Sequence, residues 1–501
     1  MPDVSPSLSV LMVASEVQPY SKTGGLADVI GSLPAALGRL GVEVTVVTPR
    51  YQDVEHQGPV TRQAAVQIGD RTLAIGFVEK QRGPRDRVVF VECDELYDRS
   101  GLYGVEGRDH EDNAIRFAAL SHAALVYAEH GPTLPSVLHA HDWQTGMAPV
   151  LARYGPRRGS RWHDVGIVFT IHNLAYQGLF PSQTLGELGL GPELFSLDGL
   201  EFWGQIGFLK GGIGFADGVT TVSRAYARQM QTPEHGQGLD GLLRHRRPVV
   251  SGILNGIDTA VWNPERDPHL PEPFSRASLA GKRAAKRALL QRYGLATDET
   301  AIRRPVVGMV SRMVDQKGLD LIREARSSLV ELGATFTVLG TGAAVYEDMW
   351  RELAAAYPSQ FGVRIGFDEE LAHLVEGGAD LFLMPSRFEP CGLNQMYSMR
   401  YGTIPVVRAT GGLEDTVVPF DPVSGTGTGF AFRDYSVPAM LAAVRDALGV
   451  YATPARWRVL QTSGMGCDFS WGASAAAYVQ VYERAIARRM VSNRGRTTYE
   501  E

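Results

Sequence analysis

A lysine and two neighbouring glycines stand at a predicted strand-to-helix turn near the amino terminus. Lys22, Gly24 and Gly25 lie in segment 21–28 (SKTGGLAD), between an apolar run and a helical pattern. A helix start offers unpaired N–H groups and a partial positive charge, and glycine lets an anion approach them closely. The turn therefore predicts a phosphate site, although it matches neither the dinucleotide fingerprint nor the Walker loop. A plain glycine turn beside an exposed lysine is the alternative.

A second phosphate-suited set falls in the other half of the chain. Arg312 and Lys317 stand in segment 311–318 (SRMVDQKG), directly after a predicted strand. Ligands of doubly wound sheets bind outside the carboxyl ends of strands, so these cations are placed to clamp a diphosphate. Two surface cations paired with nearby acids are the alternative. Gly340 ends the next predicted strand, at a turn that can admit a nucleotide.

A carboxylate precedes a further predicted helix start. Glu389 lies in segment 385–395 (PSRFEPCGLNQ), where it would repel a phosphate that it touched. We therefore expect it to accept hydrogen bonds from sugar hydroxyls one bond further along the ligand; a helix cap is the alternative. Segment 408–413 (RATGGL) repeats the Gly-Gly-Leu pattern after the following predicted strand.

Histidine, aspartate, asparagine and tryptophan gather at two strand ends of the first half. They lie in segments 139–143 (HAHDW) and 170–178 (TIHNLAYQG), and such planar polar groups beside aromatic faces are suited to sugars. For His139 and His141, which share a strand, we expect only one ring to face a given side. Histidines that serve only the structure are the alternative. The set lacks clustered carboxylates, so we predict no metal site.

The elements that position these residues read as strands alternating with helices. Continuous apolar runs indicate strands buried on both faces, as in a parallel sheet covered by helices. In the first half the predicted strands are residues 10–14, 42–48, 87–91, 137–140, 167–171 and 218–222, and the helices are 26–40, 113–129 and 145–153. In the second half the strands are 306–310, 335–339, 363–366, 380–384 and 404–407, and the helices are 318–332, 343–356, 369–376 and 392–401.

Each half is long enough for a doubly wound α/β fold, so we predict two Rossmann-like domains facing each other across a cleft. The first spans residues 1–258 and the second 259–482, with a last helix that can pack back on the first domain. Residues 483–501 read as a polar tail. The proline-rich stretch 263–275 places the hinge near Trp262.

Composition limits which binding partners and which cellular compartment we expect for the protein. The net charge of −6 argues against a nucleic-acid or anionic-membrane partner. The chain has three cysteines without a C-x-x-C pair, which suits a reducing cytosol. The first residues carry no basic leader and no long apolar run, so we expect a cytoplasmic protein. Only six residues are lysine, which makes a lysine in a glycine turn less incidental.

Taken together, these segments resemble the bacterial glycogen synthase and plant starch synthase family, glucosyltransferases of the two-domain GT-B fold. The likeness runs from about residue 10 to about residue 482. It rests on SKTGGLADVIGSLP, HAHDWQTG, TIHNLAYQG, ILNGID, SRMVDQKG, PSRFEPCGLNQ and RATGGLEDT, with DFSW at 468–471. One such motif is weak evidence, whereas all of them in this order are highly specific.

The resemblance implies that glucose passes from a nucleotide-glucose to the non-reducing end of an α-1,4-glucan, with retention at the anomeric carbon. We expect ADP-glucose as donor and glycogen as product. In such enzymes Lys22 would contact the donor, while Arg312 and Lys317 would neutralise the departing diphosphate. Glu389 would hold the glucose ring, and His172 would lie beside the sugar. These five residues are the expected catalytic set.

The wider binding sets follow from the same resemblance. The expected donor-binding residues are Lys22, Gly24, Gly25, Asp28, Asn255, Arg312, Lys317, Gly340, Glu389, Cys391, Gly392, Leu393, Thr410, Gly411 and Gly412. The expected acceptor-binding or sugar-binding residues are Tyr103, His141, Asp142, Trp143, Tyr176 and Gln177. We expect neither a metal nor PLP, because cations and helix starts can stabilise a departing diphosphate.

One departure bears on the mechanism. Many retaining GT-B enzymes carry a second glutamate eight residues after the first, where this chain has Tyr397. Bacterial and plant synthases share that difference. Since no second carboxylate is available for a glucosyl-enzyme, we expect front-face transfer, in which the leaving phosphate helps to deprotonate the acceptor hydroxyl.

Three other functions fit parts of the pattern. A PLP-dependent glucan phosphorylase needs a Schiff-base lysine, and the chain has none after Lys317. A sugar-nucleotide epimerase would share the architecture but need no glucan acceptor. A catalytically silent glucan-binding protein would keep the aromatic residues without needing the cations.

Overall fold

The computed structural model describes residues 8–55, 57–157 and 160–497. The chain divides into two compact units, one formed by Met1–Gly256 with Trp471–Glu501 and the other by Ile257–Ser470. We call them unit 1 and unit 2. The chain therefore passes from unit 1 to unit 2 at residues 256–257, where the sequence places the boundary at 258, and it returns at residues 470–471.

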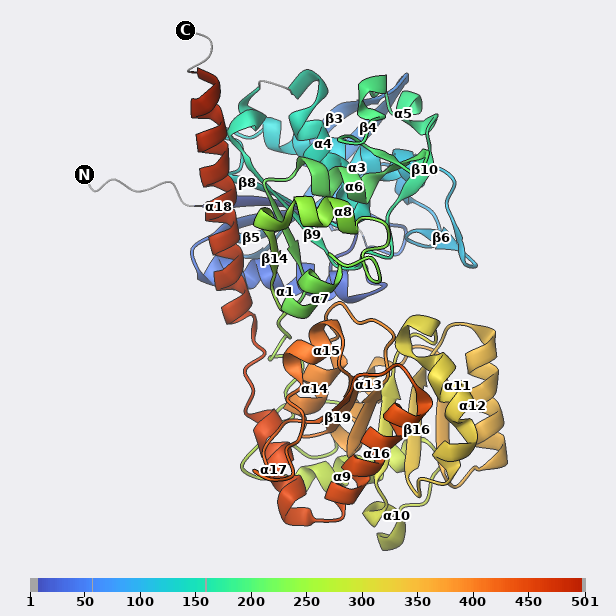
Figure 1. The fold of residues 1–501 in the computed structure, drawn as a ribbon. Helices are drawn as coiled ribbons and strands as arrows, with labels where there is room; N and C mark the ends of the chain where they lie inside the picture. The colour runs from blue at the N-terminus through green and yellow to red at the C-terminus, as the bar shows by residue number, and fades with distance from the viewer. Residues whose placement is uncertain (1–7, 56, 158–159, 498–501) are drawn as a thin grey trace, which may run out of the picture. The chain divides into compact units, whose positions relative to one another are not determined.

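The return into unit 1 is a single long helix, α18 (Trp471–Thr497) (Figure 1). It runs through the predicted boundary at 482 and through most of the predicted tail, whose last residues, 498–501, lie outside the described part. The tail reads as polar because of its arginines. Arg488 and Arg489 donate to the main-chain carbonyls of Asp217 and His163, so these cations anchor the helix within unit 1.

The predicted hinge lies inside unit 2. Trp262 stacks between His373 and Tyr397, with ring centroids 3.8 Å from each and interplanar angles of 5° and 12°. The proline-rich stretch that follows also packs there, since Asp267 Oδ2 lies 2.7 Å from His373 Nδ1. Prolines in this segment therefore shape a packed loop of unit 2, and the chain passes between the units at residues 256–257, shortly before Trp262. The hinge near Trp262 stays a prediction.

Unit 1 is built on a nine-stranded sheet within the described residues. Neighbouring strands from β14 to β5 are parallel, and β5, β4 and β3 are antiparallel. In sheet order the strands are β14 (Val250–Gly252), β13 (Gly218–Thr221), β9 (Gly166–Ile171), β8 (Val137–His141), β1 (Ser9–Val13), β2 (Glu43–Pro49), β5 (Asp86–Glu92), β4 (Arg71–Gly83) and β3 (Arg62–Ile68).

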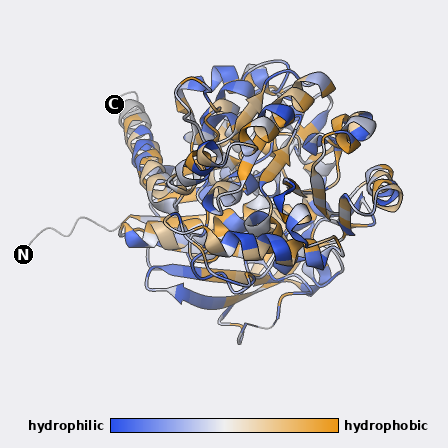
Figure 2. Ribbon diagram, turned by 90° about the horizontal axis from the view of Figure 1, so that it is seen from below, coloured by the Kyte–Doolittle hydropathy of each residue, from blue (hydrophilic) through white to orange (hydrophobic). Residues whose placement is uncertain are grey.

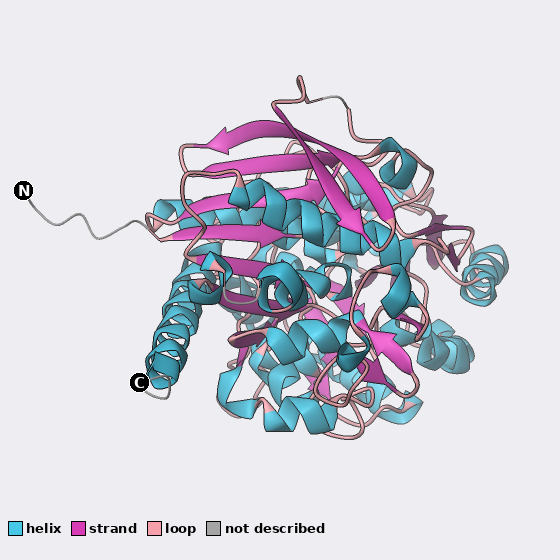
Figure 3. Cartoon of the chain, turned by 90° about the horizontal axis from the view of Figure 1, so that it is seen from above, coloured by secondary structure: helices cyan, strands magenta, loops and turns pink. Residues whose placement is uncertain are grey.

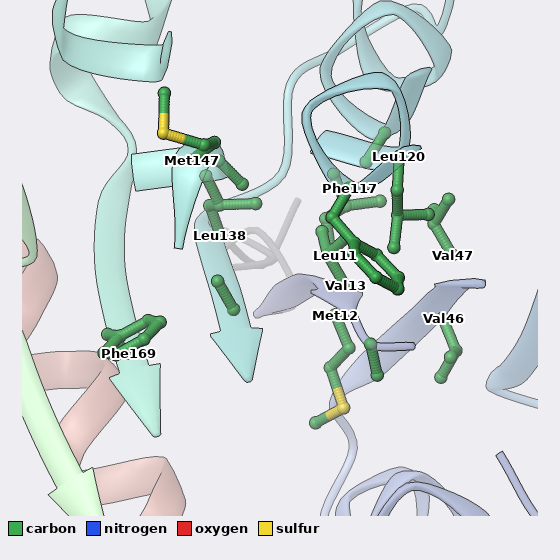
Figure 4. Packing of buried hydrophobic residues seen from close by; sticks show 14 of the residues in the cluster. Leu11, Met12, Val13, Val46, Val47, Phe117, Leu120, Leu138, Met147 and Phe169 are labelled. Atoms are coloured by element: carbon green, nitrogen blue, oxygen red, sulfur yellow. The ribbon is translucent and has the colours of Figure 1, made fainter. Parts of the chain in front are cut away.

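The central strands of unit 1 are buried on both faces, as their continuous apolar runs predict. Leu11 and Val13 of β1 face Phe117 and Leu120 of α3 (Asn113–Glu129), while Met12 points to the opposite side (Figure 4). The other helices of unit 1 are α1 (Gly25–Arg39), α2 (Asp94–Tyr97), α4 (Met147–Arg153), α5 (Thr184–Glu187), α6 (Phe208–Phe215), α7 (Arg224–Gln229) and α8 (Asp240–His245).

Two small sheets complete unit 1. One consists of β10 (Leu179–Pro181), β12 (Gln205–Gly207) and β11 (Glu201–Phe202), and the other of β6 (Gly104–Val105) and β7 (Arg108–Asp109). These short strands, like β3 and β4, are not among the predicted ones. Their burial alternates or is partial, so a search for continuous apolar runs overlooks them.

Unit 2 contains a six-stranded sheet in which all neighbours are parallel. In sheet order the strands are β17 (Phe361–Ile365), β16 (Thr335–Gly340), β15 (Val306–Val310), β18 (Leu381–Met384), β19 (Ile404–Arg408) and β20 (Phe430–Phe432). All but β20 match predicted strands. Figure 3 shows the strands of the chain with helices packed around them.

The helices of unit 2 include the four predicted ones and five more. Apolar and polar residues are mixed along the helix ribbons (Figure 2). Most buried residues of these helices are apolar, as expected for helices that turn an apolar side to the core. They are α9 (Ala280–Arg292), α10 (Glu299–Arg303), α11 (Leu319–Val330), α12 (Ala344–Ala356), α13 (Glu369–Gly378), α14 (Asn394–Arg400), α15 (Gly411–Thr416), α16 (Val437–Tyr451) and α17 (Pro454–Met465). The four predicted helices correspond to α11, α12, α13 and α14.

Candidate active site

The strand order of unit 2 determines where a ligand can bind. β15 has β16 on one side and β18 on the other, and the strands continue outward from there in both directions. This is the doubly wound order, in which a crevice opens at the carboxyl ends of the strands where the order reverses. The loops after β15 and β18 carry Lys317 and Glu389, so the structure brings these two predicted residues to that switch point.

Lys317 and Glu389 form the centre of the unit 2 site. Lys317 Nζ lies 2.6 Å from Glu389 Oε2, and the same oxygen accepts a hydrogen bond of 3.0 Å from the Ser386 hydroxyl. The Glu389 side chain is buried, and Lys317 is more exposed. Glu389 lies five residues before α14 and therefore does not cap this helix, which was the alternative interpretation of Glu389. Lys317 does pair with an acid, and that acid is the other predicted site residue.

Glycines let the loops of unit 2 pack closely at this edge. Gly318 has a φ of +77°, and a Cβ there would lie 2.1 Å from the carbonyl oxygen of Pro385. Gly411 has a φ of +48°, and a Cβ there would lie 1.9 Å from the Glu389 carbonyl oxygen. The Gly412 N–H donates to that carbonyl at 3.0 Å. The turn at 410–412 therefore supports the loop that holds Glu389.

The remaining predicted donor residues of unit 2 lie on the same loops. Gly340 is required by packing, because a Cβ there would come within 1.9 Å of the Ser311 carbonyl oxygen. Cys391 is buried, and its carbonyl accepts a hydrogen bond from Gln395 Nε2. Arg312 is exposed in the loop after β15. Gly392 (φ +70°), Leu393 and Thr410 lie at the two helix starts.

The sequence prediction missed an aromatic residue beside this edge. Phe367 follows β17 and is 84% exposed. The N–H of its neighbour Gly366 donates to the Gly340 carbonyl at 2.9 Å, which places Phe367 next to the predicted nucleotide turn. A flat exposed ring at the carboxyl edge of a doubly wound sheet is suited to stacking on a nucleotide base. Its sequence signal is an aromatic residue directly after a strand and a glycine.

Unit 1 has a switch point of its own. β1 lies between β2 and β8, so the loops after β1 and β8 meet at the reversal of strand order. The loop after β1 holds Lys22 and Gly24, and α1 begins at Gly25, one residue before the predicted start at Leu26. Lys22 Nζ forms an exposed ion pair of 2.7 Å with Oδ1 of Asp28, which lies in the first turn of α1.

A buried carboxylate that the sequence prediction missed binds the main chain of this turn. Glu16 accepts from the N–H groups of Thr23 (2.5 Å) and Gly24 (3.3 Å) and from the Thr23 hydroxyl (2.6 Å). Tyr103, a predicted sugar contact, donates its hydroxyl to Glu16 at 2.5 Å. Part of the expected anion cradle is therefore filled by the protein's own carboxylate. Glu16 precedes the glycines by eight residues without a motif to signal it.

Gly24 itself is left open. A Cβ at Gly24 would meet no atom within 4 Å, and its φ of −160° is extended backbone that any residue adopts. Neither packing nor backbone conformation inside unit 1 requires a glycine here. This differs from Gly340 and Gly411, where packing does. The open space supports the prediction that a ligand approaches the turn at Gly24.

The histidines of unit 1 share one side of the sheet. The ring centroids of His139 and His141 lie 4.0 Å apart, because residues two apart on a strand point to the same face. The expectation that only one of them faces a given side is therefore wrong. His141 Nδ1 lies 3.1 Å from His172 Nε2, whereas His139 is bonded to Thr170 and Tyr482. His139 thus belongs to the core.

Burial sets the charge of these groups. It lowers the pKa of His172 to about 3 and holds the pKa of His141 well below its ordinary value. Both rings are therefore neutral near pH 7 and can donate or accept a hydrogen bond. Burial also raises the pKa of Asp142 to about 7, against the main-chain N–H groups of His172 and Asn173, which lower it. Asp142 Oδ1 accepts from the His172 N–H at 2.7 Å.

The other predicted residues of unit 1 fall into two groups. Trp143 is buried against Phe117 and Phe180, with ring centroids 5.0 and 5.9 Å away, so its packing is that of a core residue. Tyr176 is 51% exposed, and Gln177 donates to the Gln237 carbonyl at 2.8 Å. Asn255 is buried, and its Oδ1 has no hydrogen-bond partner among the described residues.

Two further observations concern the part of the chain that the structure describes. It contains no group of three or more histidine, cysteine, aspartate or glutamate side chains placed to hold a metal ion. Among its helices, none is long and apolar enough to cross a lipid bilayer.

The fold and these two sites define a class of protein. Two doubly wound units, one with a cation–carboxylate pair and the other with a lysine-glycine turn at the switch point, form a GT-B glycosyltransferase. A family model described as starch synthase catalytic domain matches residues 9–245, and one described as glycosyl transferases group 1 matches residues 298–458. The chain belongs to the family of bacterial glycogen synthases and starch synthases.

Individual relatives agree with that assignment. Glycogen synthase from Anaeromyxobacter dehalogenans is 49% identical over 95% of this chain and 99% of its own length. Glycogen synthase from Myxococcus xanthus is 48% identical over 96% of this chain and 100% of its own.

Solved structures extend the comparison to the fold. The catalytic domain of starch synthase IV from Arabidopsis thaliana, bound to ADP and acarbose, is similar with a TM-score of 0.88 and 33% identity. The match covers 96% of this chain and 100% of that one. Sucrose-phosphate synthase from Thermosynechococcus elongatus shares the fold at a TM-score of 0.58 and 17% identity, over 96% and 100% of the two chains. The protein is therefore a glycosyltransferase, and the phosphorylase, epimerase and silent binding-protein alternatives are set aside.

Proposed function

We propose that the protein transfers glucose from ADP-glucose to the non-reducing end of an α-1,4-glucan, releases ADP and retains the anomeric configuration. The Lys317–Glu389 pair at the switch point of unit 2 carries the proposal. It sets a cation suited to phosphate 2.6 Å from a carboxylate suited to sugar hydroxyls. A nucleotide diphosphate sugar has these two parts one bond apart, so one ligand can engage both.

The choice of ADP-glucose rests on a relative. The structure of the Arabidopsis thaliana enzyme contains ADP and acarbose, a nucleotide and an oligosaccharide analogue. In this chain we assign the nucleotide to unit 2, with the base on Phe367 and the diphosphate at Arg312 and Lys317. We assign Lys22 of unit 1 to the donor as well, with Gly24 leaving space for its approach.

The proposed transfer breaks the bond between C1 of glucose and the β-phosphate oxygen. A bond forms between C1 and the acceptor oxygen on the same face, and the acceptor proton moves to the departing phosphate. Arg312 and Lys317 stabilise the negative charge that develops there, a role for which fixed cations need no reorganisation. Neutral His172 hydrogen-bonds the sugar, and Glu389 accepts from its hydroxyls.

The packing of Tyr397 supports the front-face route. This side chain, eight residues after Glu389, is buried and stacked on Trp262. A double displacement needs a carboxylate nucleophile within reach of C1. Tyr397 supplies none at this position, and the stacked aromatic pair holds that side chain in the core of unit 2.

We also propose that the reaction needs neither a divalent metal nor PLP. Lys22, Arg312 and Lys317 supply positive charge for the diphosphate, so activity is expected to survive dialysis against EDTA. A large loss that magnesium or manganese restores would contradict this charge assignment. We propose in addition that the protein acts in the cytosol, where the thiols of Cys93, Cys391 and Cys467 remain reduced; cell fractionation tests this.

The decisive experiment compares donors and variants with glycogen as primer. ADP-glucose should support transfer, and UDP-glucose should support much less. Lys317→Ala should lower kcat by about a hundredfold, a loss on the scale of one removed transition-state donor. Arg351→Ala removes the cation of an exposed ion pair with Glu347 on α12 and serves as the matched control. Equal activity of the two variants would contradict the proposal.

A further inference from the structure

An exposed tryptophan occupies a hairpin position that ordinarily takes a small polar residue. β11 and β12 pair with Phe202 opposite Gln205, so Trp203 and Gly204 alone form the turn. Their φ angles are +51° and +80°. Positive φ at both central residues is the requirement of a type I′ turn, for which Asn-Gly is the favoured pair. Trp203 therefore holds a left-handed conformation that strains a bulky residue.

Packing does not explain this residue. The Trp203 side chain is 82% exposed, so it buries little apolar surface in unit 1. Its ring meets Phe202 edge to face, with centroids 6.4 Å apart and an interplanar angle of 81°. Strain that brings no gain in stability is typical of positions retained for binding.

The neighbouring loop has a second strained residue. Gln237 has a φ of +49° and precedes Gly238. A Cβ on Gly238 would lie 3.0 Å from Phe202 Cζ and 3.3 Å from Trp203 Nε1, so this loop contacts both aromatic rings. The Gln237 carbonyl accepts from Gln177 Nε2 at 2.8 Å. The 237–238 loop thus connects the aromatic pair Phe202 and Trp203 to Gln177, a residue of the predicted acceptor set.

Two charged residues hold the hairpin, and one of them is Glu201, whose Oε1 accepts a hydrogen bond of 2.9 Å from the Gly204 N–H in the turn. Lys210 is buried and donates to the main-chain carbonyls of Leu197 (2.7 Å) and Glu201 (2.5 Å). Its ammonium anchors the base of the hairpin and is not presented to an anionic ligand. A flat aromatic face beside amide groups is suited to a neutral ligand with alternating apolar and hydroxyl-bearing edges.

We propose that Trp203, Phe202 and the 237–238 loop form a binding site for an α-1,4-glucan chain on unit 1. The C–H face of a glucose ring would lie on the Trp203 indole, and its hydroxyls would meet Gln177 and the loop backbone. The site lies outside the switch point and holds the polymer rather than its reacting end. It rests on the proposed function, because it takes the same polymer as ligand.

The experiment uses the whole protein and glycogen without donor. Binding is measured as retardation in native gels that contain increasing glycogen. Trp203→Asn should weaken glycogen binding by about fivefold, the scale of one aromatic contact. Trp203→Phe, which keeps an aromatic face, should stay within about twofold. Leu197→Ala is the matched control, since Leu197 is also exposed (81%) and lies beside the same anchor.

The thermal stability of the Trp203 variants tests the proposed site independently of glycogen binding. Asparagine is the favoured first residue of a type I′ turn, so Trp203→Asn should raise the thermal midpoint while it weakens binding. A structural role for Trp203 would lower both. Trp203→Gly, which also adopts positive φ, repeats the test should the asparagine variant fold poorly.

Several results would overturn the site. Equal glycogen binding by Trp203→Asn and Leu197→Ala would do so, as would a loss of binding that only follows a loss of folded protein. A change in oligomeric state on size-exclusion chromatography, with glycogen binding unchanged, would instead make the patch a protein interface. A wild-type protein that transfers no glucose to maltotriose contradicts the proposed function, whereas unaltered binding by the variants contradicts only this site.

Discussion

Glycine occurs at the strand ends of this chain for two different physical reasons. At Gly411 the cause is internal, since its φ is +48° and a Cβ would collide with the Glu389 carbonyl oxygen. At Gly24 the backbone is extended and the space is empty. Glycine is therefore required by close packing at Gly411 in unit 2, whereas at Gly24 in unit 1 it leaves space that a ligand can enter.

A pair of alanine variants separates these causes. Gly411→Ala should destabilise the protein by about 2 kcal/mol, because the backbone must leave a conformation that alanine resists. Gly24→Ala should leave the thermal midpoint unchanged and lower kcat/KM for ADP-glucose by about tenfold, because the added methyl group occupies the approach of the donor. Thermal unfolding and initial rates measure both. An active Gly24→Ala enzyme would mean that no ligand passes this turn.

Asp142 gives the protein a specific pH dependence. Burial raises the pKa of its carboxyl to about 7, so the folded protein binds a proton that the unfolded chain has released. The stabilising contribution is complete below about pH 4, the pKa in the unfolded chain, and is lost as the pH rises towards 7. Buried His139 and His172, whose pKa values burial lowers to about 3, give the opposite slope.

Substitution of Asp142 isolates its part of the profile. Asp142→Asn keeps an oxygen for the His172 N–H and removes the ionisation. We expect it to raise the free energy of unfolding by roughly 4 kcal/mol at about pH 8 and by only about 1 kcal/mol at about pH 4.5. The histidines contribute equally to both proteins and cancel in the difference. A difference that does not vary with pH would show that the Asp142 carboxyl is not titrating in this range.

At the scale of elements, α18 is the part of unit 1 most distant in sequence from the rest. It packs against β9 and β13, and its side chains Tyr478 and Tyr482 are fully buried. The Tyr482 hydroxyl lies 2.9 Å from His139 Nδ1, in the interior of the sheet. The last helix of the chain therefore supplies core and hydrogen bonds to the strands that carry the unit 1 site.

Tyr482→Phe tests that contribution. The substitution keeps the ring and leaves His139 Nδ1 without its partner in a buried place, which costs about 1–3 kcal/mol. We expect the thermal midpoint to fall by several degrees, whereas Tyr357→Phe, at a more exposed tyrosine of unit 2, should leave it unchanged. If both variants melt like the wild type, the hydrogen bond to His139 contributes no net stability.

At the scale of the whole molecule, the two units differ in continuity. Unit 2 is one uninterrupted segment, Ile257–Ser470, whose ends are joined by a hydrogen bond from Ile257 N–H to the Phe469 carbonyl (2.8 Å). Unit 1 needs two segments, because α18 fills its core from the far end of the chain. Unit 2 therefore has the organisation of a domain inserted into unit 1.

Fragments of the chain should reflect this difference. Residues 257–470 should fold alone and unfold cooperatively, since their core and termini are complete. Residues 1–256 should expose apolar surface and aggregate, and fusion to residues 471–497 through a flexible linker should restore folding. Circular dichroism and thermal unfolding measure these outcomes. A well-folded 1–256 fragment would show that α18 is dispensable to unit 1.

Much of the fold could be predicted because its signals are local. Buried parallel strands are continuous apolar runs, so β1, β8, β15 and their neighbours are visible in the sequence. The edge strand β3 and its neighbour β4, with one partly solvated face, lack that signal. Lys317 and Glu389 could be predicted for the same reason, since each directly follows such a strand.

The sequence by itself thus determined the class of fold, the strand-end segments and the residue types that handle phosphate and sugar. Only the tertiary structure decided which of them meet. Glu16 on the Gly24 turn, Tyr482 on His139, Trp262 inside unit 2 and Phe367 beside Gly340 join residues through folding of the chain rather than through any sequence period. The physical reason is that apolar periodicity records burial residue by residue, whereas a contact depends on two distant elements packing at one place.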